Sequence, residues 1–337
     1  MKHRRCLKSV LFVVLILLVC SVQVSAQQSR GRGIYGDWAV KVEIKGMSIT
    51  FESILSFSRD QEGNQTGSFM NFLELRELKD VKFEDGKLSF SESRRNRGET
   101  TFTGTITDGV LSGTWTGDMG DRELKGKRSP RVPRAVGNWE LTYSMGEREI
   151  TSPLIIKADA QGQLSAQSPS ERVEHTITDL AYERGELKFK RTTKMGERQF
   201  ESTFAGRIQG NAITGTFTSQ RGEAPVNGTR IGAAAIGTWI LDVANDERTL
   251  KQRLLVNPDM SALYGPLPVK KINLEGNKLS FEVTLEVGGN SGKIAFAGTV
   301  EEGKLTGEQT IFNPPTTPRG TAKVTGTKVV RRSRRRN

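Results

Sequence analysis

The sequence predicts an all-β protein that consists of three tandem antiparallel up-and-down barrels, each with about 100 residues and about eight strands. A Gly-x-Trp motif occurs three times, and its tryptophans are 101 and then 100 residues apart. After each motif, short runs of alternating apolar and polar residues are separated by turn residues, as in strands with one buried face. No stretch of comparable length shows a helical period with caps. The expected barrels span 27–132, 133–232 and 233–330.

The first stretch of the chain, 1–26, has the pattern of a secretory signal peptide. A cationic start precedes the apolar run Val10–Cys20, and small residues at Val24–Ala26 form a cleavage site. The apolar run is about half of the roughly 20 residues that span a bilayer, so we expect cleavage rather than a membrane anchor. A lipoprotein signal that ends at Cys20 is the alternative, although the bulky Val19 is unfavourable before such a cysteine. We therefore expect an exported protein, periplasmic or extracellular, with association with the cell envelope left open and no transmembrane segment after cleavage.

The chain after the signal has few side chains that could perform catalysis or hold a metal. Both cysteines, Cys6 and Cys20, lie in the predicted signal, so disulfides, zinc–thiolate sites and cysteine nucleophiles are excluded from the mature chain. Of the two histidines, only His175 remains after the loss of His3. Glu174 precedes it, but adjacent residues of a strand point to opposite faces. We expect a protein that is not an enzyme and that uses no metal and no cofactor.

The net charge of +12 is concentrated at the two ends of the chain. Without the four cations of the signal peptide and the five arginines near the C-terminus, the remaining charge is +3. We expect 331–337 to be a disordered basic tail. The alternative is a tail that contacts an anionic cell-surface polymer, lipid headgroups or nucleic acid, of which nucleic acid is the least expected. The arginines concerned are Arg331, Arg332, Arg334, Arg335 and Arg336.

Eight strands are expected in the first unit. Trp38, Val40 and Val42 alternate with polar residues, which is the period of a strand with one buried face. Asp108-Gly109 is a favoured two-residue turn and joins two later strands as a hairpin. A simple succession of short strands favours an up-and-down barrel over a sandwich. The expected strands are 38–44, 48–58, 66–72, 75–83, 87–93, 99–106, 110–116 and 122–128.

Several residues recur at matching positions in all three units and are interpreted as a common scaffold. Besides the tryptophan, each unit has a Leu-x-Phe strand after a turn, a Phe-x-Gly strand, and a closing glycine two residues before a cation. A glycine inside a strand marks a sharp bend or the close approach of a packed ring. The third unit is shorter only between its tryptophan and its Leu-x-Phe strand, at 42 residues against 52 and 50. The main recurring residues are Trp38, Trp139 and Trp239; Phe90, Phe189 and Phe281; and Gly104, Gly206 and Gly298.

A Gly-x-Trp first strand followed by a meander of about eight strands resembles the calycin group, which includes the lipocalins and the avidin-like barrels. The motif stands at 36–38, 137–139 and 237–239. The resemblance implies lipocalin-like barrels in which Trp38, Trp139 and Trp239 form the floor at the closed end, while the open end takes a small, usually apolar ligand. The units are shorter than typical lipocalins, and the other lipocalin signature motifs are missing from the sequence.

Function is expected where the units differ, and the first unit differs most visibly. Its third predicted strand has large apolar residues on both faces, and its seventh has a tryptophan that is Phe217 in the second unit and Gln309 in the third. Large apolar groups of this kind line a ligand pocket or cover a neighbouring barrel, and both interpretations stay open at this point. The candidate ligand-binding residues are Phe69, Met70, Phe72 and Trp115.

The sequence thus predicts an exported, non-enzymatic binding protein for a small apolar or amphipathic ligand. The alternative is an envelope-associated scaffold or interaction protein that uses the outer faces of its barrels and the basic tail. Three similar copies favour multivalent contact, since repetition raises avidity more readily than it refines one pocket. The resemblance to ligand-binding barrels favours the first interpretation.

Overall fold

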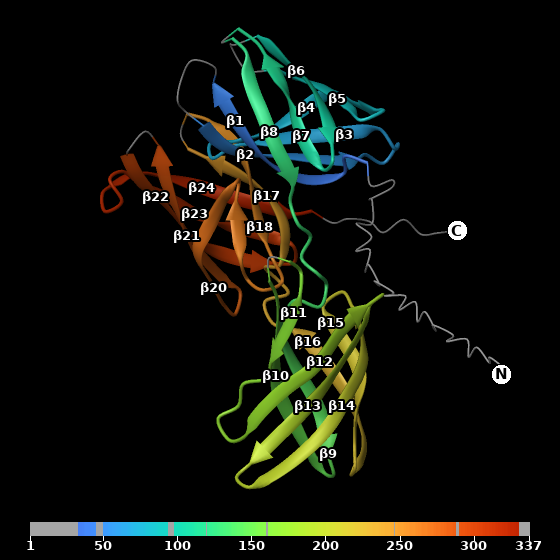
Figure 1. The fold of residues 1–337 in the computed structure, drawn as a ribbon. Helices are drawn as coiled ribbons and strands as arrows, with labels where there is room; N and C mark the ends of the chain where they lie inside the picture. The colour runs from blue at the N-terminus through green and yellow to red at the C-terminus, as the bar shows by residue number, and fades with distance from the viewer. Residues whose placement is uncertain are drawn as a thin grey trace, which may run out of the picture. The chain divides into compact units, whose positions relative to one another are not determined.

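The computed structural model describes residues 33–44, 50–93, 98–118, 120–159, 161–245, 247–287 and 290–329, and all regular elements in these ranges are β-strands. Three groups of eight antiparallel strands follow one another along the chain (Figure 1). The prediction of three tandem eight-stranded barrels is confirmed. The predicted signal peptide and the arginine tail lie outside the described residues.

The strands of the three barrels have lengths from three to twelve residues. Barrel 1 consists of β1 (Gly36–Ile44), β2 (Thr50–Arg59), β3 (Gln65–Met70), β4 (Leu75–Glu84), β5 (Lys87–Ser93), β6 (Glu99–Thr107), β7 (Val110–Thr116) and β8 (Arg122–Arg128). Barrel 2 consists of β9 (Gly137–Met145), β10 (Arg148–Ala158), β11 (Leu164–Gln167), β12 (Glu174–Glu183), β13 (Glu186–Met195), β14 (Arg198–Gln209), β15 (Ala212–Ser219) and β16 (Gly222–Arg230). Barrel 3 consists of β17 (Gly237–Ala244), β18 (Thr249–Val256), β19 (Ala262–Tyr264), β20 (Leu267–Glu275), β21 (Lys278–Val287), β22 (Asn290–Glu301), β23 (Lys304–Phe312) and β24 (Pro318–Lys328).

The strands pair as a meander, in which each strand lies beside the next and the first beside the last. In barrels 1 and 3 the ladder is closed, whereas in barrel 2 the strands β11 and β12 share no ladder. The hairpins depend on turn residues with positive φ. Asp108 and Gly109 have φ of 50° and 76°, as a two-residue hairpin turn with matching twist requires.

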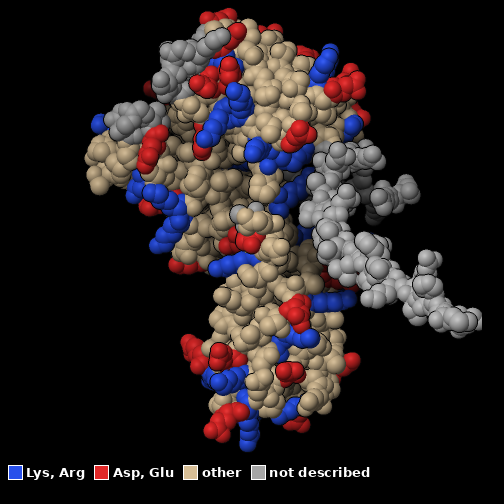
Figure 2. All heavy atoms as spheres, viewed as in Figure 1, with Lys and Arg blue, Asp and Glu red and all other residues tan. Residues whose placement is uncertain are grey.

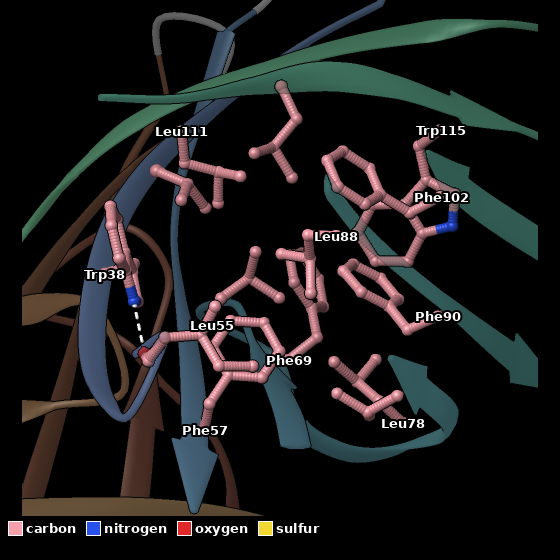
Figure 3. Packing of buried hydrophobic residues seen from close by; sticks show 14 of the residues in the cluster. Trp38, Leu55, Phe57, Phe69, Leu78, Leu88, Phe90, Phe102, Leu111 and Trp115 are labelled. Carbon is pink, nitrogen blue, oxygen red and sulfur yellow. Dashed lines mark hydrogen bonds between the residues drawn. The ribbon is translucent and has the colours of Figure 1, made fainter. Parts of the chain in front are cut away.

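Apolar side chains from alternating strand positions fill the interior of each barrel. Figure 3 shows this packing in barrel 1, where Phe90, Phe102 and Trp115 point toward one another. The recurring phenylalanine stacks on a phenylalanine of the next strand in every barrel, so that one core arrangement is packed three times. The stacked pairs are Phe90–Phe102, Phe189–Phe204 and Phe281–Phe296, with ring centroids 4.7, 4.8 and 4.9 Å apart.

A pair of facing glycines explains why glycine recurs inside the strands. Gly206 lies opposite Gly215 in the ladder between β14 and β15, and the ring of Phe204 reaches both. A Cβ added at Gly206 would lie 2.5 Å from Cζ of Phe204 and 2.7 Å from the carbonyl oxygen of Thr214. Real Cβ atoms do not make such short contacts, and the carbonyl is backbone that cannot turn aside. The same facing pairs are present at 104 with 113 and at 298 with 307.

Replacing Gly206 by alanine is therefore expected to destabilise barrel 2 by about 1–3 kcal/mol, the range found for overpacked cores. Hydrogen exchange resolved by peptide measures the loss as faster exchange confined to strands β9–β16. Gly320→Ala is the matched control, because nothing lies within 4 Å of the added Cβ at that position. Equal effects of the two substitutions would contradict the packing role of the glycine pair.

Each tryptophan of the Gly-x-Trp motif is buried and is hydrogen-bonded to the chain that enters its barrel. The indole Nε1 donates to the carbonyl oxygen four residues earlier, over 2.8, 3.0 and 2.7 Å in the three barrels. The cation that closes each unit lies over the same ring and donates to carbonyl oxygens of the entering chain. This arrangement explains why a cation recurs there. The stacked pairs are Trp38–Arg128, Trp139–Arg230 and Trp239–Lys328, at 4.7, 3.9 and 5.4 Å from the cation to the ring centroid.

Acidic and basic side chains are interspersed on the surface of the barrels. Figure 2 shows Lys and Arg beside Asp and Glu across the visible face. Pairs such as Lys251–Asp242, at 3.0 Å, join exposed side chains. Water screens such pairs, so they contribute little to stability. Charges inside the barrels are more informative, because burial removes much of their contact with water.

Candidate functional site at the mouth of barrel 2

One inward position holds a residue of different charge in each barrel. It lies two residues after the recurring phenylalanine and therefore on the same face of the strand. Glu92 occupies it in β5, Arg191 in β13 and Val283 in β21, and all three are buried. In barrel 1 the carboxylate of Glu92 lies 2.7 Å from Nε of Arg76 and forms an ion pair with it. In barrel 2 the charge at this position has the opposite sign.

The guanidinium of Arg191 lies against aromatic rings. Its Cζ is 3.9 Å from the ring centroid of Phe217 and 5.2 Å from that of Tyr143. Arg191 is 7% exposed, and its Nε is buried without a hydrogen-bond partner among the described residues. The described ion pairs of barrel 2 involve Lys188 and Lys190 instead. Cation–π contacts offset only part of the cost of removing a cation from water. The position of Arg191 would therefore stabilise an anion.

Polar side chains of neighbouring strands surround this end of the barrel. Nδ1 of His175 and Oγ1 of Thr193 share a hydrogen bond of 3.0 Å, and Thr193 is two residues from Arg191 on the same face. The hydroxyl groups of Ser152 and Ser168 share a hydrogen bond of 3.1 Å. Both serines are buried. We define the mouth of barrel 2 as Tyr143, Ser152, Ser168, His175, Arg191, Thr193 and Phe217.

The wall of barrel 2 is interrupted beside the mouth. Strand β11 pairs with β10, and β12 pairs with β13, but β11 and β12 share no ladder. The corresponding strands of the other barrels, β3 with β4 and β19 with β20, are paired. A strand edge without a ladder opens at a lower free energy than a paired one. We therefore expect the seam between β11 and β12 to open more readily than the paired strands of the wall, and Ser168 directly follows β11.

The pKa of His175 is lowered from its ordinary value of 6.5, first by burial and second by the positive charge of Arg191. The unfolded chain thus binds a proton at His175 more readily than the folded barrel does. The free energy of unfolding is therefore expected to fall as the pH drops below about 6.5, and to level off below the pKa of the folded state. NMR titration of the imidazole measures the shift, and Arg191→Met is expected to raise the pKa toward the ordinary value. An unchanged pKa in this variant would contradict the coupling of the two groups.

The structure distributes the four candidate ligand residues of barrel 1 over different surroundings. Phe69 and Trp115 lie in the core, where their rings meet edge-on at 4.8 Å between centroids. Met70 is fully buried but lies outside this core cluster, at the end of β3. Phe72 follows β3 and is half-buried. The ligand role of these residues stays a prediction, as does the polyanion contact of the arginine tail, which lies outside the described residues.

The segment after β3 contacts barrel 3. Nε2 of Gln252 in β18 donates to the carbonyl oxygens of Asn71 and Phe72, at 3.2 and 3.4 Å. Next to it, Nη1 of Arg253 pairs with Oδ2 of Asp37 at 3.0 Å, and the Arg253 side chain is only 5% exposed. Contact with a neighbouring barrel is the second of the two interpretations given above for this segment.

Sequence reasoning did not single out Arg191, Tyr143 and Phe217. These residues can be identified in the sequence if the inward positions of the three units are compared with one another. Four residues after the motif tryptophan, the units have Val42, Tyr143 and Val243, and two residues after the recurring phenylalanine they have Glu, Arg and Val. A change from apolar or acidic to basic at an inward position marks the second barrel as different.

Neither a metal site nor a membrane-spanning helix is found in the described ranges. Over those ranges, no group of three or more His, Cys, Asp or Glu side chains is placed to hold a metal ion. The described part of the chain also has no helix of sufficient length and apolar character to cross a membrane.

No protein-family model matches the chain, and no curated protein sequence matches it. Similar solved structures include a candidate outer membrane protein of Bacteroides fragilis, at 11% identity and a TM-score of 0.22, with 88% of this chain and 98% of that chain covered. A mutant of transferrin-binding protein B from Haemophilus parasuis has 10% identity and a TM-score of 0.18, with 82% and 65% covered. A protein of unknown function from Nostoc punctiforme has 13% identity and a TM-score of 0.16, with 88% and 96% covered. At such scores the assignment of the fold rests on the strand pairing of this chain itself.

Proposed function

We propose that this chain is an exported, non-enzymatic binding protein whose second barrel binds a small amphipathic anion at its mouth. The observation that carries the proposal is the buried guanidinium of Arg191, which lies 3.9 Å from the ring centroid of Phe217 and has no carboxylate partner among the described residues. Burial of a cation without an anion is strongly unfavourable. A carboxylate or sulfonate bound to Arg191 would recover part of that free energy through charge-assisted hydrogen bonds.

The apolar part of the proposed ligand would contact the aromatic and aliphatic side chains of the same barrel. The rings of Tyr143 and Phe217 meet edge-on at 5.1 Å, and Ile150 and Ile177 are only partly buried against the core. Each methylene group that leaves water contributes about 0.8 kcal/mol. A hydrocarbon chain with one anionic group therefore fits these surroundings better than a bare inorganic ion does. Entry is proposed to use the seam between β11 and β12.

The surroundings of His175 support binding rather than catalysis. Asp179 lies on the same strand as His175, but its carboxylate pairs with Lys190 at 2.8 Å. The ladder between β12 and β13 also shifts register between Thr178 and Ala181, at the position of Asp179. The hydrogen-bond partner of the imidazole is a threonine hydroxyl. An orienting carboxylate of the kind that activates a histidine as general base is thus not in contact with it in the described structure.

Barrels 1 and 3 differ from barrel 2 at the inward positions that correspond to Arg191 and Phe217, because their residues there are neutral or paired. In barrel 1, Glu92 is paired with Arg76 at 2.7 Å. In barrel 3, the hydroxyl group of Tyr264 donates to Oε1 of Gln309 at 2.7 Å, and Val283 takes the place of Arg191. The proposed anion site is therefore specific to barrel 2.

Isothermal titration with dodecanoate tests the proposal. The natural protein is expected to bind dodecanoate, and Arg191→Met to bind it at least about tenfold more weakly. The reason is that a hydrogen bond to a charged group contributes about 1.5–3 kcal/mol, and about 1.4 kcal/mol corresponds to tenfold. Dodecanol has the same chain without the charge and is expected to bind both proteins equally. Bound dodecanoate should also raise the pKa of His175, because its carboxylate offsets the charge of Arg191.

Arg148→Met is the matched control, since it removes an exposed arginine from the same barrel. It should leave the affinity for dodecanoate unchanged, whereas equal losses in both variants would show general charge attraction and contradict a site at Arg191. Absence of binding by the natural protein would also contradict the proposal. Loss of folding is not expected in Arg191→Met, because an apolar side chain in place of a buried charge is often neutral or stabilising.

The basic tail suggests a second function, contact with the cell envelope. Five of the last seven residues are arginines, a density that favours an anionic polymer as partner. Co-sedimentation with anionic cell-wall polymer tests this contact. The intact chain is expected to bind, and a chain truncated after Val330 is expected not to bind. Equal binding by both would exclude the tail as the contact.

A further inference from the structure

A hollow on barrel 2 is lined by three arginines and lies at the end of the barrel where Trp139 is located. Its volume is about 590 Å³, and it lies where the turns after β12 and β14 meet the segment that enters β9. This end of the barrel is separate from the mouth, which lies toward the other ends of the same strands. The charged and aromatic side chains that line the hollow are Arg134, Tyr182, Arg184 and Arg207.

The hollow has a strongly positive lining. No Asp or Glu is among the residues that line it. Arg207 lies opposite Glu186 in the ladder between β13 and β14, but the carboxylate of Glu186 pairs with Lys188, at 3.6 Å. The three arginines of the hollow are exposed, and within the described residues their guanidinium groups form no ion pair with a carboxylate. Their hydrogen-bonding groups are therefore available to an anion from outside.

The arginines are specific to the second barrel. The landmarks shared by the three units align the positions in the hollow with positions at the same turns of barrels 1 and 3, where the residues are acidic, polar or small. The scaffold thus does not require a cation at these turns. Arg184 corresponds to Asp85 and Gly276, and Arg207 corresponds to Thr105 and Thr299.

A buried arginine fixes the segment that carries Arg134. Nη2 of Arg230 donates to the carbonyl oxygen of Arg134 at 2.7 Å, and Nη1 donates to that of Val136. The same guanidinium lies 3.9 Å from the ring centroid of Trp139. Burial lowers the pKa of Arg230 to about 10, so it stays charged at neutral pH. The backbone under the hollow is therefore held in place before any ligand arrives, which lowers the entropy cost of binding.

We propose that this hollow binds a phosphate ester, with the phosphate between Arg184 and Arg207 and the organic group against Tyr182. A guanidinium presents two parallel N–H donors that match two oxygens of a phosphate. The volume of about 590 Å³ is much larger than a phosphate ion and falls in the range of small-molecule sites, so room remains for the organic group. The shared chemistry is the phosphate ester, whether it is carried by a soluble sugar or by a lipid headgroup.

Titration with glucose 1-phosphate, with glucose as the neutral twin, tests the soluble form. Vesicles that contain phosphatidate in phosphatidylcholine test the lipid-borne form. The double variant Arg184→Asp with Arg207→Thr places the residues of barrel 1 into barrel 2, so the fold is expected to tolerate it. The natural protein is expected to bind one of the two esters, and the double variant at least tenfold more weakly. Neither should bind glucose or pure phosphatidylcholine.

A control variant with the same change of charge, Arg148→Asp with Arg198→Thr, alters exposed positions at the other end of the barrel. It should keep the affinity for the ester, and Arg207→Thr alone should show an intermediate loss. The proposal is overturned if the natural protein binds neither ester, or if the control loses as much affinity as the double variant. The double variant should still bind dodecanoate, so the outcome is independent of the function proposed for the mouth.

Discussion

Replacing Glu92 by leucine should destabilise barrel 1 by about 3–5 kcal/mol, the range measured when one partner of a buried ion pair is removed. Glu92 has a fully buried side chain, and its carboxylate lies 2.7 Å from Nε of Arg76, whose side chain is 15% exposed. The substitution removes the fully buried carboxylate from the guanidinium of Arg76, whose Nη1 keeps its pair with Glu74 at 3.1 Å. Hydrogen exchange of peptides from β1–β8 measures the loss, because it separates barrel 1 from the other two.

Two further variants test the reason for this loss. Glu77→Leu removes an exposed glutamate from β4 and should have a small effect. Arg76→Leu combined with Glu92→Leu removes both charges and should recover most of the stability, because an apolar pair of similar volume is often as stable as a buried ion pair. A double variant as unstable as Glu92→Leu would contradict the electrostatic explanation and indicate a packing defect.

Replacing Trp139 by alanine should destabilise barrel 2 by about 3–5 kcal/mol, as is usual when a buried Trp is truncated. The ring is fully buried, its Nε1 donates to the carbonyl oxygen of Ala135, and its face carries the guanidinium of Arg230. Truncation leaves a cavity and also deprives a buried cation of its aromatic contact. Exchange should therefore become faster in β9 and β16 together, since these strands carry the two residues.

Trp139→Phe is the graded control for this prediction. It keeps an aromatic ring under Arg230 and loses the hydrogen bond to Ala135, so we expect a loss nearer to about 1 kcal/mol from that bond, plus a small cavity term. Barrels 1 and 3 should keep their exchange rates in both variants. Loss of protection throughout the chain would show that the barrels do not unfold separately.

The arrangement of the strands could be predicted from the sequence because its determinants are local. Alternation along Trp38, Val40 and Val42 sets one buried face, and the turn residues Asp108 and Gly109 have the positive φ that a hairpin needs. The shortening of the third unit before its Leu-x-Phe strand is also visible in the structure, where β19 has only three residues. Repetition of the same landmarks three times made these local signals stronger.

The candidate site could not be predicted in the same way, because its determinants are not local. The seam exists because β11 and β12 share no ladder. Turn residues predict where two strands are joined, but they do not predict that two successive strands stay unpaired. The bulge near Asp179 changes the face on which later residues of β12 lie. The alternation of β13 predicts correctly that Arg191 points inward. A charged residue at such a position contradicts the usual apolar pattern of a buried face. Its contacts with Phe217 and Tyr143 show how the barrel holds it.

The ladder that closes each barrel has a consequence for the order in which the protein assembles. Most strand pairs join neighbours along the chain, but β1 pairs with β8, so that Trp38 meets Arg128 from about 90 residues away. During synthesis the N-terminal strands emerge first, and β8 is complete before β16 and β24 exist. Barrel 1 can therefore close while the similar last strands of the other barrels are still absent. A chain that refolds from denaturant has no such protection, because β1 then meets the two competing strands β16 and β24 as well as β8.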